Sequence, residues 1–306
     1  AEGEGVARVD GQVVFVPGVI PGERCKIKID HVGRTCAYGS LVRVEKTSEH
    51  RVTPECESFG HCGGCVFWHM DYACELEQKR RRVQDALSRI GGIDFPDLQI
   101  TGSESIYGYR NKVQFPVQVQ NGKAVAGFYK AGSHTVIPIT DCKIQPGVAK
   151  TIRAAVLSWM EKENVPAYDE RTHTGLVRHI YLRYGAKSGQ TLVCTVANCE
   201  ALPKKKALVR EILAADANVT GIVVNYNTKK SNVILGERFE TLYGEGYLED
   251  MLLGLTFRLS PAAFYQVNHD QAQRLYEKAL EYAGLTGREL AVFSTIILLL
   301  ERGTGL

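Results

Sequence analysis

The sequence predicts a multi-domain α+β protein, because two kinds of pattern follow one another along its 306 residues. Residues 1–47 contain short β-type runs separated by Pro-Gly and Gly turns, which is typical of a small β-barrel. From residue 98 to residue 260, strand-like and helix-like segments mix without a strict β-α-β alternation. The length favours two or three domains, and 44% hydrophobic with 23% charged residues is ordinary for a globular protein.

The first segment is expected to form an OB-like β-barrel, whose exposed strand faces and loops contact nucleic acid. Its β-type runs are Gln12–Val16, Cys25–Asp30 and Ser40–Glu45, and its turns are Pro17-Gly18, Pro21-Gly22 and Gly33. A small β module that only packs against its neighbour would have the same composition, so this alternative stays open.

Three cysteines, Cys56, Cys62 and Cys65, come next, with five and two residues between them. Thiolates at this spacing are able to share one inorganic centre, because the intervening glycines let the backbone fold tightly and point N–H groups at sulfur. Cys142, in a polar turn, is the best candidate for a fourth ligand. Nine cysteines, an odd number, favour reduced thiols that hold a metal over a disulfide framework. Tetrahedral zinc is the alternative, although structural zinc sites usually use two close pairs.

A basic helix is expected between its cap at Asp71 and Ile90. Its apolar residues recur at helical spacing and are expected to face the core: Leu76, Val83, Leu87 and Ile90. The run at residues 79–82 consists of four consecutive cations. Such a run is often only a solvated surface, but beside a metal site and an OB-like barrel we expect Arg80 and Arg81 to contact phosphates.

Further elements are expected along the rest of the chain. Asn121-Gly122 predicts a hairpin between strands at 111–119 and 124–130. Helices are expected at 148–163, 203–215 and 270–283, and strands at 176–184, 191–197, 221–227 and 233–238. Arg110, Lys112, Arg178 and Arg183 alternate with bulky residues, an arrangement that suits single-stranded RNA. A half-exposed sheet with solvated side chains is the alternative.

Together these residues resemble the bacterial RNA 5-methyluridine methyltransferases that act on uridines of 23S ribosomal RNA. The resemblance covers almost the whole chain. It rests on the Cys56-x5-Cys62-x2-Cys65 motif with Cys142, Tyr109-Arg110-Asn111-Lys112, Arg178-His179-Ile180, and Phe264-x-Gln266-x-Asn268. It implies that residues 1–47 are a TRAM module trimmed at its N-terminus, and that the four cysteines ligate a [4Fe–4S] cluster. A fully ligated cluster of this kind is expected to be structural.

The resemblance also implies that Gln266 contacts S-adenosylmethionine and that Phe264 lies near a flipped target uracil. In such enzymes a cysteine thiolate attacks C6 of the uracil, C5 accepts the methyl group and a carboxylate removes the C5 proton. Neither the nucleophile nor the carboxylate has a matching position in this chain. Cys194 and Cys199 fall outside any family catalytic motif, so we predict no catalytic residue.

After Gly287 the family pattern continues into a Rossmann-like domain with a glycine-rich cofactor turn, whereas this chain has the apolar run 290–300 and ends at Leu306. We therefore expect a TRAM barrel at 1–47, a central α+β domain with the cluster and an RNA-facing surface at 48–260, and the beginning of a methyltransferase domain at 261–306. That last domain is expected to be mostly missing, through truncation or a shifted reading frame.

The predicted function is S-adenosylmethionine-dependent methylation of C5 of uridine in 23S rRNA by the parent protein, in rRNA processing, with this chain itself inactive. The alternative is a non-catalytic RNA-binding module with a structural iron–sulfur or zinc site. Because the net charge is only +3, any positively charged surface that attracts a nucleic acid has to be a local patch. The chain opens without a signal region and its longest apolar run is too short for a membrane span, so we expect a cytoplasmic monomer that binds neither membrane nor DNA.

Overall fold

The computed structural model describes residues 3–284, which form two compact units. Residues 3–60 and 65–102 belong to unit 1, and residues 61–64 and 103–284 belong to unit 2. Our expectation of a shifted reading frame after Gly287 lies outside the described residues. Within 3–284, no helix is both long enough and apolar enough to cross a bilayer.

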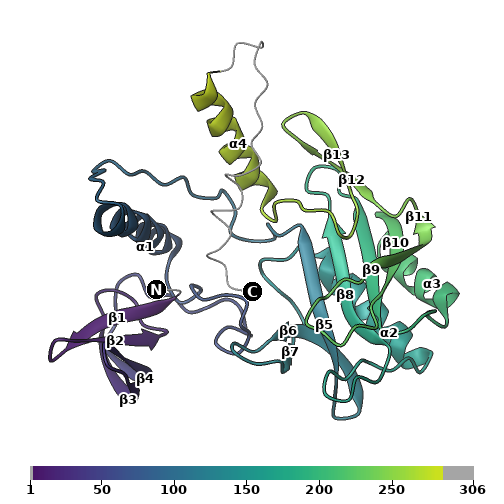
Figure 1. Cartoon of the computed structure of the whole chain (residues 1–306), viewed down its shortest axis with the longest axis horizontal. Coiled ribbons are helices and arrows are strands. Elements are labelled where there is room, and N and C mark those ends of the chain that lie inside the picture. The colour runs from purple at the N-terminus through teal and green to yellow at the C-terminus, as the bar shows by residue number, and fades with distance from the viewer. Residues whose placement is uncertain (1–2, 285–306) are drawn as a thin grey trace. The chain divides into compact units, whose positions relative to one another are not determined.

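Unit 1 contains a four-stranded sheet with the strand order β1-β2-β4-β3 (Figure 1). Its strands are β1 (Glu4–Val9), β2 (Gln12–Pro17), β3 (Arg24–Val32) and β4 (Cys36–Lys46). The three expected β-type runs are confirmed, since each lies within one of these strands. Only Val14, Val16 and Ala37 form its buried centre, so most side chains of β3 and β4 remain exposed.

The basic helix of unit 1 is α1 (Tyr72–Asp85), which continues into the π-helical turn η1 (Ala86–Ile90). The Asp71 cap is confirmed, because Asp71 Oδ1 accepts the backbone N–H of Cys74 at 2.7 Å. The expected inward orientation is wrong for Val83 and Ile90, which are 49% and 88% exposed. The reason is that the buried hydrophobic cluster beside α1 is small. Cys74, in the first turn, is the one residue of α1 that belongs to it.

Unit 2 is built on a seven-stranded mixed sheet with the order β11-β10-β9-β8-β5-β6-β7 (Figure 1). The parallel pair β9 and β10 is joined by helix α3, and the other neighbouring strands are antiparallel. The strands are β5 (Lys112–Gln120), β6 (Lys123–Tyr129), β7 (Val136–Pro138), β8 (Val177–Tyr184), β9 (Thr191–Ala197), β10 (Val219–Tyr226) and β11 (Arg238–Gly244). The helices are α2 (Val148–Lys162), α3 (Lys205–Ala215) and α4 (His269–Ala283), and a separate hairpin consists of β12 (Leu248–Leu252) and β13 (Leu255–Leu259).

Apolar side chains cover both faces of this sheet, which explains why β8 is buried along nearly its whole length. Ile180 and Leu182 lie in the core that includes residues of α2 and α3, such as Trp159. Tyr181, on the other face, lies in a second core with Leu248, Leu259 and other residues from the hairpin side. Because side chains alternate along a strand, Arg183 shares the face of Tyr181.

Most expected elements of unit 2 are confirmed, and one strand is wrong. Asn121 and Gly122 have φ values of 52° and 76°, as the tight turn between β5 and β6 requires. The strand expected at 233–238 does not form, since β11 begins only at Arg238. Asn227 Nδ2 binds the carbonyls of Val233 and Ile234, so side-chain hydrogen bonds replace a strand ladder there.

Candidate functional site

Two sequence motifs that lie far apart in the chain meet next to the start of α4. The backbone N–H of Asn111 donates to the Val267 carbonyl at 2.9 Å, and its side-chain Nδ2 donates to the Gln266 carbonyl at 2.7 Å. Arg110 also forms an isolated antiparallel bridge with Asn268. The strand motif at 109–112 and the loop motif at 264–268 therefore form one structural element.

A cleft of about 190 Å³ lies beside this junction, within unit 2. It is lined by aromatic, cationic and polar residues, which include Tyr107, Tyr109, Arg110, Asn111, Tyr184, Lys187, Asn268 and Asp270. Asn268 closes one side as the cap of α4, where its Oδ1 accepts the Gln271 N–H at 3.1 Å. The positive end of the helix dipole thus faces the same region as two basic side chains.

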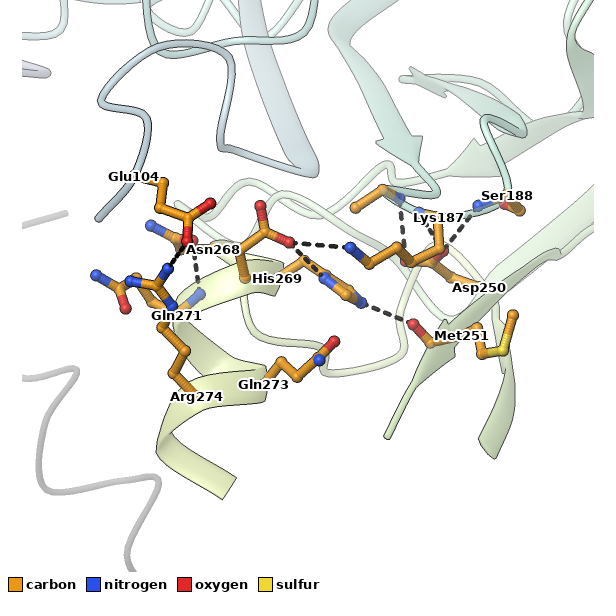
Figure 2. A network of polar contacts seen from close by, with 12 residues as sticks. Glu104, Lys187, Ser188, Asp250, Met251, Asn268, His269, Gln271, Gln273 and Arg274 are labelled. Carbon is orange, nitrogen blue, oxygen red and sulfur yellow. Dashed lines mark hydrogen bonds and ion pairs between the residues drawn. The ribbon is translucent and has the colours of Figure 1, made fainter. Parts of the chain in front are cut away.

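Polar contacts fix the geometry around the start of α4 (Figure 2). His269 is 2% exposed and donates its Nε2–H to the Met251 carbonyl at 2.7 Å, while its Nδ1 lies 3.1 Å from Asp270 Oδ1. Lys187 Nζ lies 3.5 Å from the same carboxylate oxygen. Contact with the His269 ring, with help from the Lys187 charge, holds the pKa of Asp270 below its usual value.

The turn that carries Lys187 is held by a buried carboxylate. Asp250 is 1% exposed and accepts the backbone N–H groups of Ala186, Lys187 and Ser188 at 3.0, 2.9 and 3.2 Å (Figure 2). Sequence reasoning missed Asp250, Lys187 and His269. Their role depends on the β12–β13 hairpin, for which we predicted no strand.

Two buried polar atoms next to the cleft lack a hydrogen-bond partner within the described part of the chain, namely Arg110 Nε and Asn111 Oδ1. Buried polar groups are nearly always paired, so atoms of this kind often belong to sites that a ligand completes. Of the predicted RNA contacts, Arg110 lines the cleft and Lys112 follows directly after Asn111 at the start of β5.

Arg178 and Arg183 are buried, in contrast to the ligand-facing positions expected for them. Arg178 Nη1 binds the carbonyls of Asn227 and Lys229 at 2.9 and 2.8 Å, and its Nη2 binds that of Ser231 at 3.0 Å. Arg183 binds the Pro261 and Ala263 carbonyls. We therefore replace a direct RNA contact by a structural role for both residues.

In the loop motif, Phe264 is 62% exposed and Gln266 is half-buried. The intervening Tyr265 is buried, and its ring lies 6.1 Å from that of Phe257. The loop thus presents Phe264 to solvent while Tyr265 attaches it to the fold.

The basic run of α1 is largely paired within the helix. Arg80 Nε and Arg81 Nε lie 2.8 and 2.6 Å from the carboxylate oxygens of Glu77, and Lys79 lies 2.6 Å from Glu75. Hydrogen bonds from Arg80 and then Arg81 lower the pKa of Glu77 to about 2. These exposed pairs reduce the field that α1 presents to a phosphate, although solvent and salt screen them.

The predicted cluster ligands divide between the units, with Cys56 and Cys65 in unit 1 and Cys62 and Cys142 in unit 2. Within residues 3–284, no three His, Cys, Asp or Glu side chains form a group that could hold a metal ion. The local backbone nevertheless suits a thiolate ligand, because the Gly64 N–H points at Cys62 Sγ at 3.3 Å. A Cβ on Gly63 would approach the Ala131 N and Cα at 3.0 and 3.1 Å, so this segment needs glycine.

The two other cysteines considered have properties unsuited to nucleophilic catalysis. Cys194 is fully buried, and burial raises the pKa of its thiol to about 12. Burial likewise raises the pKa of Cys199. A thiol with a raised pKa supplies little thiolate at neutral pH.

Comparison with known proteins supports the resemblance seen in the sequence. Residues 1–42 match the TRAM domain. A Bacillus cereus protein described as an uncharacterized RNA methyltransferase is 39% identical over 292 residues, and a Clostridium acetobutylicum protein with the same description is 40% identical over 291 residues. The matches cover 95% and 94% of this chain. The chain is homologous to RNA methyltransferases. It spans 64% and 63% of the length of these two relatives.

A solved structure shows the same fold. The Pyrococcus abyssi tRNA (uracil-54, C5)-methyltransferase in complex with S-adenosyl-L-homocysteine has a TM-score of 0.68 and 24% identity to this chain. The match covers 92% of this chain and 65% of that one.

These matches correct two of our predictions. We expected the methyltransferase domain to be mostly missing and the catalytic domain to be absent from the chain. Both expectations are wrong, because nearly the whole chain aligns with methyltransferases and has the fold of one. The prediction rested on the missing glycine-rich turn after Gly287, and it overlooked that the mixed sheet of unit 2 itself belongs to this fold.

Proposed function

We propose that the protein to which this chain belongs methylates C5 of uridine in RNA, with S-adenosylmethionine as the methyl donor. The observation that carries the proposal is the junction of the Asn111 strand with the Gln266 loop beside a cleft that contains aromatic and basic side chains. Aromatic rings stack on unpaired bases and cations hold phosphates, which is how proteins bind single-stranded RNA. The methyltransferase homologues support the reaction class.

Within this proposal the exposed ring of Phe264 contacts the target base, and Gln266 contacts S-adenosylmethionine. Arg110 and Lys112 contact the RNA near the cleft, while Arg80 and Arg81 contact phosphates through α1. The bound cofactor supplies an electrophilic methyl group. The role of the described residues is to bind the RNA and to hold the loop at 261–268 in one conformation.

We further propose 23S rRNA as the substrate, bound by a monomer in the cytoplasm. Residues 1–47 would serve as the TRAM module, residues 48–260 as the region with the cluster, and residues 261–306 as part of the cofactor-binding region. The Pyrococcus abyssi protein is named as a tRNA methyltransferase, so the two RNA classes have to be compared directly.

We also propose that Cys56, Cys62, Cys65 and Cys142 hold a [4Fe–4S] cluster. The glycine-lined Cys62 segment and its N–H···S contact support thiolate ligation. Zinc would suit four thiolates as well. Protein purified without oxygen distinguishes the two, because an iron–sulfur protein is brown and contains iron and sulfide, whereas a zinc protein is colourless.

The test of function has two parts. Transfer of labelled methyl groups from S-adenosylmethionine is measured with the complete gene product that contains this chain, on 23S rRNA fragments and on tRNA. RNA binding is measured with the 306-residue chain on the same RNAs, with single-stranded DNA of the same sequence as control. Methylation of tRNA alone would contradict the rRNA assignment, and RNA binding without any methyl transfer would leave a non-catalytic RNA-binding protein.

A further inference from the structure

The loop that leads to Phe264 is attached to β8 by two buried side chains. Tyr181 Oη donates to the Pro261 carbonyl at 2.7 Å, and Arg183 donates to the same carbonyl from Nε and Nη2, both at 3.3 Å. Arg183 Nη2 also binds the Ala263 carbonyl. Tyr181 and Arg183 are 2% and 3% exposed, so water competes little for these bonds.

The other side of the loop is attached to the residue before β5 and to the β12–β13 hairpin. Asn111 binds both the Gln266 and the Val267 carbonyls, and Tyr265 is buried with its hydroxyl 3.4 Å from Asp250. Phe264 is therefore flanked by fixed neighbours, while 62% of its own surface remains exposed. Hydrogen bonds on both sides therefore fix the backbone that carries the exposed ring relative to β8 and the start of β5.

We infer that Tyr181 and Arg183 are positioning residues that fix Phe264 for contact with an RNA base. This inference rests on the proposed function, because it assigns Phe264 to the RNA surface. Stability gives a poor reason for a guanidinium here. Within residues 3–284 it donates to main-chain carbonyls and lies 5.8 Å from the centre of the Tyr181 ring, but it forms no ion pair with a carboxylate. A buried cation without an anionic partner is unfavourable compared with an apolar side chain. The fork geometry, in contrast, lets one side chain hold the carbonyls of two loop residues.

Arg178 provides a matched control on the same strand. It is 5% exposed and binds three main-chain carbonyls, but these belong to the loop at 227–231. Arg178→Lys and Arg183→Lys should therefore remove a similar number of hydrogen bonds to main-chain carbonyls, at two arginines that are similarly buried. Only the second change affects the loop of Phe264.

The experiment is a double-mutant cycle in the full 306-residue chain. Affinity for a short single-stranded RNA that contains uridine next to 2-aminopurine is measured for Arg183→Lys, Phe264→Ala and the double variant. We expect Arg183→Lys to weaken binding roughly tenfold, the order expected for one lost charge-assisted hydrogen bond. We also expect it to reduce quenching of 2-aminopurine and to have no further effect once Phe264 is Ala, because residues that act as a unit are not additive. Tyr181→Phe is expected to act in the same direction with a smaller effect.

Hydrogen exchange of the amides at 262–267 and the thermal midpoint are measured in parallel. Faster exchange in Arg183→Lys at an unchanged midpoint, with Arg178→Lys normal in both RNA assays, supports the inference. An additive cycle, or an equal loss of affinity in Arg178→Lys, would overturn it while the proposed function stands. If Phe264→Ala alone leaves affinity and quenching unchanged, the proposed RNA contact of Phe264 is wrong and the inference is wrong with it.

Discussion

Asn111 donates its side-chain amide to the carbonyl of Gln266 at 2.7 Å, across 155 residues of sequence. This bond joins the start of β5 to the loop before α4, and the backbone bond from Asn111 to Val267 reinforces it. The two motifs beside the cleft are therefore energetically linked, so a change in one should affect the function of the other.

Replacement of Asn111 tests this link. Asn111→Ala leaves the Gln266 carbonyl without its donor, which should cost about 1–3 kcal/mol of unfolding free energy and weaken RNA binding. Asn225→Ala is the matched control, because Asn225 is also fully buried and its Nδ2 binds the Gly236 and Arg238 carbonyls away from α4. Urea unfolding should show destabilisation in both variants, and at least as much in Asn225→Ala because Asn225 Oδ1 also accepts the Gly236 N–H. RNA titration should show reduced affinity only in Asn111→Ala. Equal affinities would argue against a functional junction.

Charge changes on α1 test whether its cations contact RNA. The double variant Arg80→Ala/Arg81→Ala should weaken binding of all RNA sequences and reduce the slope of log K against log salt by about 1.4, or 0.7 per lost contact with single-stranded RNA. Glu77→Gln removes the carboxylate that pairs with both arginines and should have the opposite effect. Lys206→Ala/Arg210→Ala is the control, because it also removes two exposed cations from a helix. That helix, α3, packs on one face of the seven-stranded sheet, and the β12–β13 hairpin packs on the opposite face. An unchanged salt slope in the α1 variant would mean that this run is only a solvated surface.

Substitutions at two neighbouring glycines of the cysteine motif distinguish a specific backbone clash from a general effect of a larger side chain. In Gly63→Ala the new methyl group meets the backbone of Ala131, whereas in Gly64→Ala it lies at an ordinary 3.4 Å from Cys62 Sγ. Iron and sulfide per chain, measured after anaerobic purification, should fall strongly in Gly63→Ala and in Cys62→Ser and remain near the original value in Gly64→Ala. Full iron content in Cys62→Ser would contradict the proposed ligand set.

Acid should destabilise unit 2 through His179. This side chain is 6% exposed, and burial followed by the Arg178 charge lowers its pKa from 6.5 to about 4. Between these values the unfolded chain binds a proton that the folded chain does not, so stability falls as pH decreases through this window and is flat above it. The expected loss is roughly 3 kcal/mol, at about 1.4 kcal/mol per pKa unit. Urea unfolding followed by Trp159 fluorescence, with Trp68 replaced by Phe, measures it. His179→Leu should lose most of this dependence, and an unchanged slope would assign the effect to other groups.

Local sequence patterns predicted most helices and strands of this fold, but they could not predict contacts between residues that lie far apart in the chain. Residues 121–122 and Asp71 carry local turn and cap signals, and both predictions are confirmed. The alternation along β8 correctly indicated a strand, but not that both faces would be covered. For this reason Arg178 and Arg183 were predicted to face RNA, although the elements that bury them lie 49 to 80 residues further along. The hairpin at 248–259 was missed as well, and with it the role of Asp250.

The burial of β8 on both faces has a consequence for recognition. Arg178 near one end of the strand and Arg183 near the other each hold a surface loop by its main chain. With a rise of about 3.3 Å per residue, the Cα atoms of the two arginines lie about 16 Å apart along β8. Both loops are thus ordered before any ligand arrives. Association then loses little loop entropy, and less of the contact energy is spent on ordering the protein.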